Sequence, residues 1–385
     1  MLYHLTNWLS SQGIDIPGAG LMSYLSFRAM LAAIISMLIA FIAGGKIIKW
    51  LQRKQIGETI RDLGLEGQMQ KKGTPTMGGI IIILAVTVSA LLVCNLQSIY
   101  TQLLLLTTLW CGAIGFVDDS IKVFKHNKDG LSERGKLLSQ LALGVIVAVV
   151  MCISTSIHTD SIITTIPFVK EHEFDYRCLS PFSGQMGVYF TWGLYMLVII
   201  FIILACTNGA NLTDGMDGLN AGTSAIVGVV MGVMAWLSGD ALDAGYLNIM
   251  HIPGSGEVAI YMAAFVGALI GFLWYNTYPA QVFMGDTGSL MIGGVIGVSA
   301  VLIHKELMLP IMCGIFLAES LSVLVQRYWF KYTRKRYGQG RRVFLMAPLH
   351  HHFQKKGEPE ARIVGRFWIA GIILAVSTLA LLKIR

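Results

Sequence analysis

The chain has 385 residues, of which 55% are hydrophobic and only 13% are charged, and its net charge is +7. With a mean hydropathy of +0.65, it has too few charged groups to cover the surface of an ordinary soluble protein, so that class is excluded. The composition therefore predicts an integral membrane protein. The first twenty residues contain no basic segment ahead of an apolar core, so we expect no cleaved signal peptide.

About ten apolar segments follow in chain order. A helix needs roughly 20 apolar residues to cross the hydrocarbon of a bilayer. The segments that meet this length are 22–46, 77–96, 100–117, 137–157, 188–207, 218–238, 256–275, 286–304, 307–328 and 363–383, and the shortest break between two of them lies at 304–306. The sequence shows no repeat and no second domain. Residues 1–385 are therefore expected to form one all-α bundle.

The basic residues indicate which face of this bundle is cytoplasmic. The loops after the first, third and ninth segments contain 23 of the 29 Lys and Arg residues. Because cytoplasmic loops are enriched in Lys and Arg, we expect this face inside and both termini outside. The segment 329–362 is then a basic cytoplasmic loop, whereas 156–187, with its β-branched run, is an outer excursion that forms a small hairpin or an irregular cap.

Two adjacent acids end the third apolar segment, in the stretch GFVDDSIKVFK. If the helix continues, Lys122 lies four residues after Asp118 and three after Asp119, so it can sit beside either carboxylate. A solvated ion pair at a helix end would explain this pattern. Carboxylates that directly follow an apolar span also lie where a lipid head group would be, and there they could bind a divalent cation or take a proton from a phosphate.

Two further acidic loops are predicted on the same face. In NGANLTDGMDGLN an Asn or Asp recurs at every third position, and NTYPAQVFMGDTGSL places an aspartate between glycines. Turns and helix caps would account for each loop separately. Oxygen-rich loops without basic partners also suit a hard cation or a polyhydroxylated ligand, so three acidic clusters on one face predict an acidic basin. The residues concerned are Asn208, Asn211, Asp214, Asp217, Asn220, Asn276 and Asp286.

Basic and histidine-rich segments are expected beside this basin. KKGTPTMGG, with Lys71 and Thr76, leads into the second span, where its lysines could contact anionic lipids or bind phosphates. In LHHHFQKKG the three histidines would point about 100° apart on a helix, so they cannot all ligate one metal ion. The alternatives that remain for His350, His351 and His352 are a polar surface loop or recognition of a phosphate or sugar.

The chain resembles, over nearly its whole length, the polyprenyl-phosphate N-acetylhexosamine-1-phosphate transferases. The motifs that carry this resemblance are, in order, KKGTPTMGG, GFVDDSIKVFK, NLTDGMDGLN, FMGDTGSL and MAPLHHHFQKKGEPE. The last motif is typical of one branch, the bacterial phospho-N-acetylmuramoyl-pentapeptide transferases. The resemblance implies ten transmembrane helices with both termini outside, a location in the bacterial inner membrane, and an active site on the cytoplasmic face.

The resemblance also implies a reaction and a set of site residues. The reaction is transfer of phospho-MurNAc-pentapeptide from UDP-MurNAc-pentapeptide to undecaprenyl phosphate, which forms lipid I and UMP with Mg²⁺ as cofactor; a homodimer and no nucleic-acid partner are implied as well. Asp286 is implied as the Mg²⁺ ligand, and Asp118 and Asp119 as the catalytic pair that receives the lipid phosphate. The implied substrate-binding residues are Lys71, Thr76, Lys122 and Lys136 around the phosphates, Asn211, Asp214, Gly215, Met216, Asp217, Asn276 and Phe283 around the nucleoside, and Gln326, His350, His351 and His352 toward the sugar and peptide.

Two other functions fit part of the pattern. A UDP-GlcNAc-using relative would share the acidic motifs and the lipid acceptor but differ in the histidine segment. A lipid or nucleotide-sugar flippase would place ionisable residues in a midplane cavity, and the spans contain few of these. The chain departs from the branch at Met216, Gln354 and Glu358, none of which is at the expected metal site. The sequence leaves both direct attack and a covalent aspartyl intermediate open.

Overall fold

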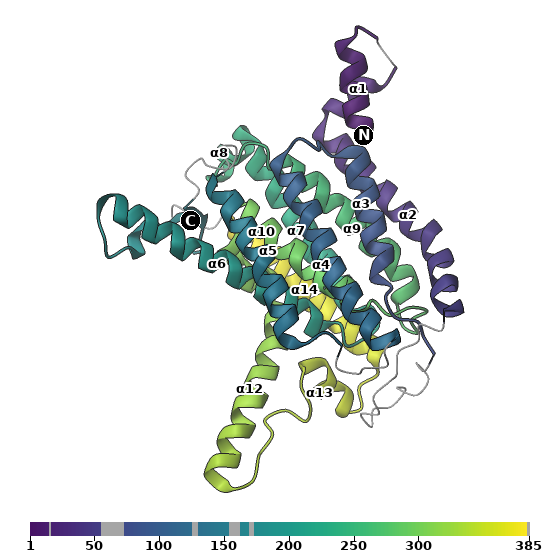
Figure 1. Cartoon of the computed structure of the whole chain (residues 1–385), viewed down its shortest axis with the longest axis vertical. Helices are drawn as coiled ribbons and strands as arrows, with labels where there is room; N and C mark the ends of the chain where they lie inside the picture. Colours follow the sequence, from purple (N-terminus) through teal and green to yellow (C-terminus); the bar gives the residue numbers. More distant parts are fainter. Residues whose placement is uncertain (15–16, 55–72, 125–129, 154–161, 169–172, 383–385) are drawn as a thin grey trace.

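The computed structural model describes residues 1–14, 17–54, 73–124, 130–153, 162–168 and 173–382, and it is almost entirely helical (Figure 1). The long helices are α2 (Leu25–Arg53), α4 (Ile99–Phe124), α5 (Glu133–Ile153), α6 (Gly184–Thr213), α7 (Leu219–Gly239), α9 (Gly256–Asn276), α10 (Gly285–Leu302), α12 (Gly314–Tyr337) and α14 (Glu360–Leu381). The shorter helices are α1 (Leu2–Ser11), α3 (Gly79–Val93), α8 (Ala241–Leu247), α11 (Leu309–Met312) and α13 (Leu349–Lys355), and the 3-10 turns are η1 (Ala19–Ser23), η3 (Tyr176–Leu179) and η4 (Glu306–Met308). The strands within these ranges are β1 (Ile163–Thr165) and β2 (Glu173–Asp175).

Nine of the ten predicted apolar segments coincide, within the described residues, with one main helix each, whereas the predicted segment 307–328 is divided between η4, α11 and α12. Within the described residues, eight helices are long and apolar enough to cross a membrane. A ninth candidate joins Glu306–Met312 to α12 with a bend of 79°, and α3, at 15 residues, is shorter than the predicted 77–96. The prediction of an all-α, multi-pass membrane protein is therefore confirmed. The count of ten crossings and the outward orientation of the termini stay predictions.

Helix α10 forms the centre of the bundle. Every residue from Thr287 to Leu302 is buried, and α3, α4, α6 and α7 pack around the helix (Figure 1). Small residues permit this packing, since a Cβ atom on Gly293 would lie only 2.3 Å from the carbonyl oxygen of Cys206 on α6. The first turn of α10 carries Asp286. Packing along the whole of α10 thus fixes the position of Asp286.

Strands β1 and β2 form an antiparallel pair in which Thr164 lies opposite Phe174. Of the two alternatives expected within 156–187, a small hairpin or an irregular cap, the described residues show the hairpin. It packs on the turn that follows α10, because Thr165 donates its backbone N–H to the carbonyl oxygen of His304 (3.0 Å) and its hydroxyl accepts a hydrogen bond from Lys305 Nζ (2.6 Å). The hairpin therefore closes the end of α10 that lies opposite the acidic first turn.

Helix α12 is longer than the predicted span. It continues to Tyr337 and ends at Gly338, which has a φ of +74°, so the loop predicted to begin at 329 begins nine residues later. The hydropathy criterion ended the span where charged and aromatic residues begin, but such residues are compatible with a helix. In Figure 1, α12 projects away from the rest of the bundle, and α13 lies beside it.

A buried ion pair joins α2 to α9, and we expect its loss to destabilise the fold. Arg28 contacts the two carboxylate oxygens of Glu257 at 2.8 and 2.9 Å and donates to the carbonyl oxygen of Val93 at 3.1 Å. In Arg28→Ala the Glu257 carboxylate, whose side chain is 12% exposed, would keep the N–H of Asn95 but lose its countercharge, which costs up to about 3–5 kcal/mol. Thermal unfolding in detergent would show a lower melting temperature. Arg177→Ala removes an exposed pair with Asp175 and is the control, so equal shifts in the two variants would contradict this prediction.

Candidate active site

The ends of α3, α4 and α10 meet at one junction. Phe283, just before α10, donates its N–H to the carbonyl oxygen of Pro75 and accepts a hydrogen bond from the N–H of Gly78, both at 2.8 Å. On the other side, Gly115 of α4 lies directly against the first turn of α10, because a Cβ atom there would be 2.1 Å from the backbone oxygen of Asp286. These contacts fix the start of α10 against two other helices.

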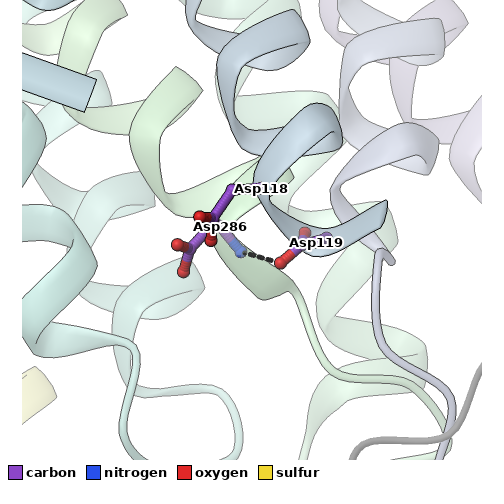
Figure 2. Close-up of side chains that lie close together, drawn as sticks. All are labelled: Asp118, Asp119 and Asp286. Carbon is purple, nitrogen blue, oxygen red and sulfur yellow. Dashed lines mark hydrogen bonds between the residues drawn. The ribbon is translucent and has the colours of Figure 1, made fainter. Parts of the chain in front are cut away.

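Asp118, Asp119 and Asp286 lie together at this junction (Figure 2). One carboxylate oxygen of each residue lies within 4.8 Å of the others. Asp118 and Asp119 are neighbours on α4 and are buried, whereas Asp286 comes from α10 and its side chain is 15% exposed. Two acidic clusters separated by more than 160 residues therefore converge, as the sequence predicted.

Two lysines contact two of these three carboxylates. Lys122 Nζ lies 2.6 Å from Asp118 Oδ2 and 3.0 Å from Asp286 Oδ2, and Lys136 Nζ lies 3.0 and 2.7 Å from the same two atoms. Asn211 of α6 donates a hydrogen bond to Asp286 Oδ1 at 2.9 Å. Lys122 comes from α4, as its spacing from Asp118 predicted, and Lys136 comes from α5. Both ammonium groups are partly exposed, so they can also face the phosphate of a ligand.

Asp119 points toward the backbone of α10. Its Oδ1 accepts the N–H of Asp286 at 3.1 Å (Figure 2). Its Oδ2 accepts the N–H (2.9 Å) and the hydroxyl (2.6 Å) of Thr287. The first N–H groups of a helix have no partner within the helix, so Asp119 satisfies two of them. Asp119 thereby holds the start of α10 and the backbone that carries Asp286.

The oxygen atoms at the junction suit a divalent cation such as Mg²⁺. Magnesium prefers carboxylate and other hard oxygen ligands. Three carboxylates beside two lysines give the junction a formal charge of −1 when all five groups are ionised, and Asp286 is the most exposed of the three acids. Asp286 is therefore the residue best placed to bind the cation, with Asp118 next to it.

A second group of predicted residues links the turn between α6 and α7 to the loop before α10. Asp217 Oδ2 accepts the N–H of Ala280, and Asn276 Oδ1 accepts the N–H of Gly218, both at 3.0 Å. Glu360, in the first turn of α14, accepts the N–H of Asp217 at 2.8 Å. The two loops are thus joined by side-chain-to-backbone hydrogen bonds. The carboxylate of Glu360 in this link was not foreseen from the sequence.

The other residues expected near the nucleoside and phosphates differ in exposure. Met216 is buried in an apolar cluster formed with residues of α7 and α14, and Thr76 is also buried. Phe283 and Asp214 are partly exposed, in the loop before α10 and in the turn after α6. Lys71 lies outside the described residues.

His351 and His352 are partly exposed on α13. His351 Nδ1 lies 3.1 Å from Gln354 Oε1, and His352 Nδ1 accepts the backbone N–H of Leu345 at 3.1 Å. Desolvation and the nearby Lys356 ammonium lower the pKa of His352 below its usual value of 6.5. The lowered pKa favours the neutral ring that this acceptor role requires.

His350 differs from its neighbours because its ring is completely buried. It lies between Glu319 of α12 and Gly215 of the turn after α6. Gln326, also expected to face the donor, exchanges two hydrogen bonds with the backbone of Phe344, at 3.0 and 3.1 Å. It holds the segment that leads to α13. The contact of Glu319 with the histidine segment was not predicted, although a lone acid within an apolar span is a signal that could have led to it.

The chain is similar to known proteins over its whole length. The family model described as Glycosyl transferase family 4 matches residues 101–304, and a pattern described as Phospho-N-acetylmuramoyl-pentapeptide-transferase signature 1 matches residues 71–83. The chain is 52% identical to the phospho-N-acetylmuramoyl-pentapeptide-transferase of Parabacteroides distasonis, 51% identical to that of Flavobacterium psychrophilum and 46% identical to that of Bacteroides fragilis. Each of these alignments covers 100% of both chains.

Proposed function

The chain belongs to the phospho-N-acetylmuramoyl-pentapeptide-transferase family of enzymes, and from this premise we propose the reaction that it catalyses. It transfers phospho-MurNAc-pentapeptide from UDP-MurNAc-pentapeptide to undecaprenyl phosphate, forming lipid I and UMP. The observation that supports this most directly is the junction of three carboxylates and two lysines at one end of an apolar helical bundle. Such a junction can bind a metal-associated diphosphate beside the head group of a membrane lipid.

The chemistry requires charge neutralisation and alignment more than a reactive side chain. One phosphoanhydride bond is exchanged for another, and the second pKa of a phosphate monoester is about 6, so the lipid phosphate is largely ionised at neutral pH. When bound at Asp286, Mg²⁺ would offset negative charge on the donor diphosphate and on the leaving UMP. Lys122 and Lys136 bind the phosphates and keep them in line for the attack.

The two adjacent aspartates have different roles in this proposal. Asp118 contacts both Lys122 and Lys136, so it orients the two ammonium groups that receive the lipid phosphate. Both oxygens of Asp119 accept hydrogen bonds from α10, so this residue positions Asp286. The contacts of Asp119 leave neither of its oxygens free to act as a nucleophile. Since the lysines beside Asp118 also bind the ionised lipid phosphate, we favour direct attack by that phosphate over a covalent intermediate.

The nucleotide of the donor is assigned to the turn after α6 and the loop before α10. Phe283, partly exposed beside the junction, offers its ring to the uracil. Thr76 and Lys71 are assigned to the phosphates, and His351 and His352 to the sugar and peptide. The other residues assigned to the nucleoside pocket are Asn211, Asp214, Gly215, Met216, Asp217 and Asn276.

We also propose the location, the orientation and the assembly of the enzyme. The junction lies on the cytoplasmic side of a bacterial inner membrane, with ten crossings and both termini outside, because the loops on the side of the junction carry most of the Lys and Arg residues. Undecaprenyl phosphate reaches the junction from the inner leaflet. Two copies of the chain form a homodimer, as the family resemblance implies.

Release of UMP tests the reaction directly. Purified protein with Mg²⁺ and undecaprenyl phosphate is expected to release UMP from UDP-MurNAc-pentapeptide and much less from UDP-GlcNAc, because the histidine segment distinguishes the two donors. Chelation of the metal by EDTA should stop the reaction, and added Mg²⁺ should restore it. Equal or greater release from UDP-GlcNAc would favour the GlcNAc-using alternative. Absence of UMP from both donors would overturn the proposed function.

A further inference from the structure

The ring of His350 fills the space between two elements that are distant in sequence. Its Nδ1 lies 3.2 Å from Glu319 Oε1 of α12. On its other side, a Cβ atom added to Gly215 would lie 2.1 Å from its Nε2. Only a glycine leaves room for the ring at this distance. His350 therefore sets the separation between α13 and the turn that follows α6.

Glu319 fixes the orientation of this histidine. Its carboxylate is completely buried and accepts the backbone N–H of Leu349 at 2.7 Å and that of His350 at 3.3 Å. The residue before α13 is Pro348, which provides no side-chain cap, so Glu319 satisfies N–H groups that have no partner within the helix. A buried carboxylate is costly unless it is hydrogen-bonded. These hydrogen bonds therefore hold the backbone of His350 to α12, and the ring is placed by that backbone and by its 3.2 Å approach to Glu319.

The turn at Gly215 leads directly to the proposed active site. Four residues before it, Asn211 donates to Asp286 Oδ1, and two residues after it, Asp217 accepts the N–H of Ala280. A change in the separation between α13 and this turn would therefore move residues assigned to the metal and to the nucleoside. It would leave the contacts of the two lysines with Asp118 in place.

We propose that Glu319 is a positioning residue of the donor site, which acts through His350 on the turn at Gly215. This inference rests on the proposed function, since it concerns the same donor. His350 is then a spacer between α13 and the turn, while His351 and His352 are the members of the motif that face the donor. The inference explains why an acid lies within an otherwise apolar span.

Donor binding without turnover tests this inference. Glu319→Gln keeps the size of the side chain but removes its charge and replaces one acceptor oxygen with a donor. The N–H groups of Leu349 and His350, which now contact a carboxylate, would then share a single, neutral acceptor oxygen. We expect the Kd for UDP-MurNAc-pentapeptide, measured by calorimetry in Mg²⁺ without undecaprenyl phosphate, to rise about tenfold or more in Glu319→Gln and in His350→Ala. The double variant should bind no more weakly than His350→Ala, because Glu319 acts through that ring. The KM for undecaprenyl phosphate should stay within about twofold of the wild-type value.

A nearby substitution serves as the control for general damage to α12. Ser322→Ala removes a buried hydroxyl that donates to the backbone carbonyl oxygen of Glu319 within α12. It leaves the contacts of the Glu319 carboxylate with α13 in place, so it should leave the donor Kd unchanged. Unchanged donor binding in Glu319→Gln and His350→Ala would overturn the inference while leaving the reaction intact. So would losses that add in the double variant, or an equal rise in the KM for the lipid. If the wild-type protein does not bind the donor, the proposed function itself is wrong and the inference falls with it.

Discussion

Asp286→Asn is expected to lower turnover by about 10³-fold while the protein stays folded. An amide is neutral, so it would be a poor Mg²⁺ ligand and would no longer pair with Lys122 and Lys136, which lie 3.0 and 2.7 Å from the carboxylate. Because Asn and Asp have the same shape, the packing of the first turn of α10 should be kept. The loss should therefore appear in kcat and in the Mg²⁺ dependence, without a large change in melting temperature.

The measurement is UMP release over a range of Mg²⁺ concentrations. The Asp286→Asn variant should require much more Mg²⁺ for its residual activity. Asp243→Asn, in α8, is the matched control, because Asp243 lies at the opposite end of α7 from the turn at Gly215. Wild-type turnover and Mg²⁺ dependence in the Asp286 variant would show that another residue binds the metal.

The sequence predicts that the acidic loops converge. It does not predict which aspartate contacts α10 and which contacts the two lysines. Basic residues placed the loops on one face, and the three carboxylates do meet there. Neighbouring residues on a helix point about 100° apart, so Asp118 and Asp119 leave α4 in different directions although one oxygen of each lies at the junction. The sequence does not say which of the two turns toward α10, because that depends on how α4 is rotated against its neighbour.

The same geometry applies to the histidines. Their angular separation excluded a shared metal ion, and it also implies that one member of the triplet faces inward. Which histidine is buried depends on the packing of α13 against α12, and this packing involves Glu319, 30 residues earlier in the chain. Glu319 can be recognised in the sequence as an isolated acid, but its contact with His350 cannot.

The helix boundaries show a different limit of the sequence. Hydropathy measures how much of a helix suits the interior of a bilayer, and it does not detect where the helix ends. Helix α4 continues seven residues past its predicted span and carries Asp118 and Lys122, while α12 continues nine residues past its own. In both cases the extra turns contain charged residues, and in α4 they bring Asp118 and Lys122 to the junction.

Gly115→Ala is expected to lower turnover by about 100-fold, although Gly115 carries no chemistry of its own. Its added Cβ would lie 2.1 Å from the backbone oxygen of Asp286 and 2.5 Å from Thr287 Cα. Since these are backbone atoms of α10, the helix start must move away from α4. The hydrogen bonds from the N–H groups of Asp286 and Thr287 to Asp119 would then lengthen, and Asp286 would leave the position at which it faces Lys122.

Gly193→Ala is the control for Gly115→Ala. It shows the general effect of alanine in a helix without any displacement of α10. Gly193 lies within α6, and a Cβ atom there meets nothing within 4 Å, so the substitution should leave activity unchanged and stabilise the helix by up to about 1 kcal/mol. In Gly115→Ala, overpacking costs about 1–3 kcal/mol and offsets that gain. UMP release and thermal unfolding of both variants test this difference. Equal activities would mean that the start of α10 can shift without disturbing the site. The contacts of Asp119 with α10 would then not be what holds Asp286 in place, and the role assigned to Asp119 would be wrong.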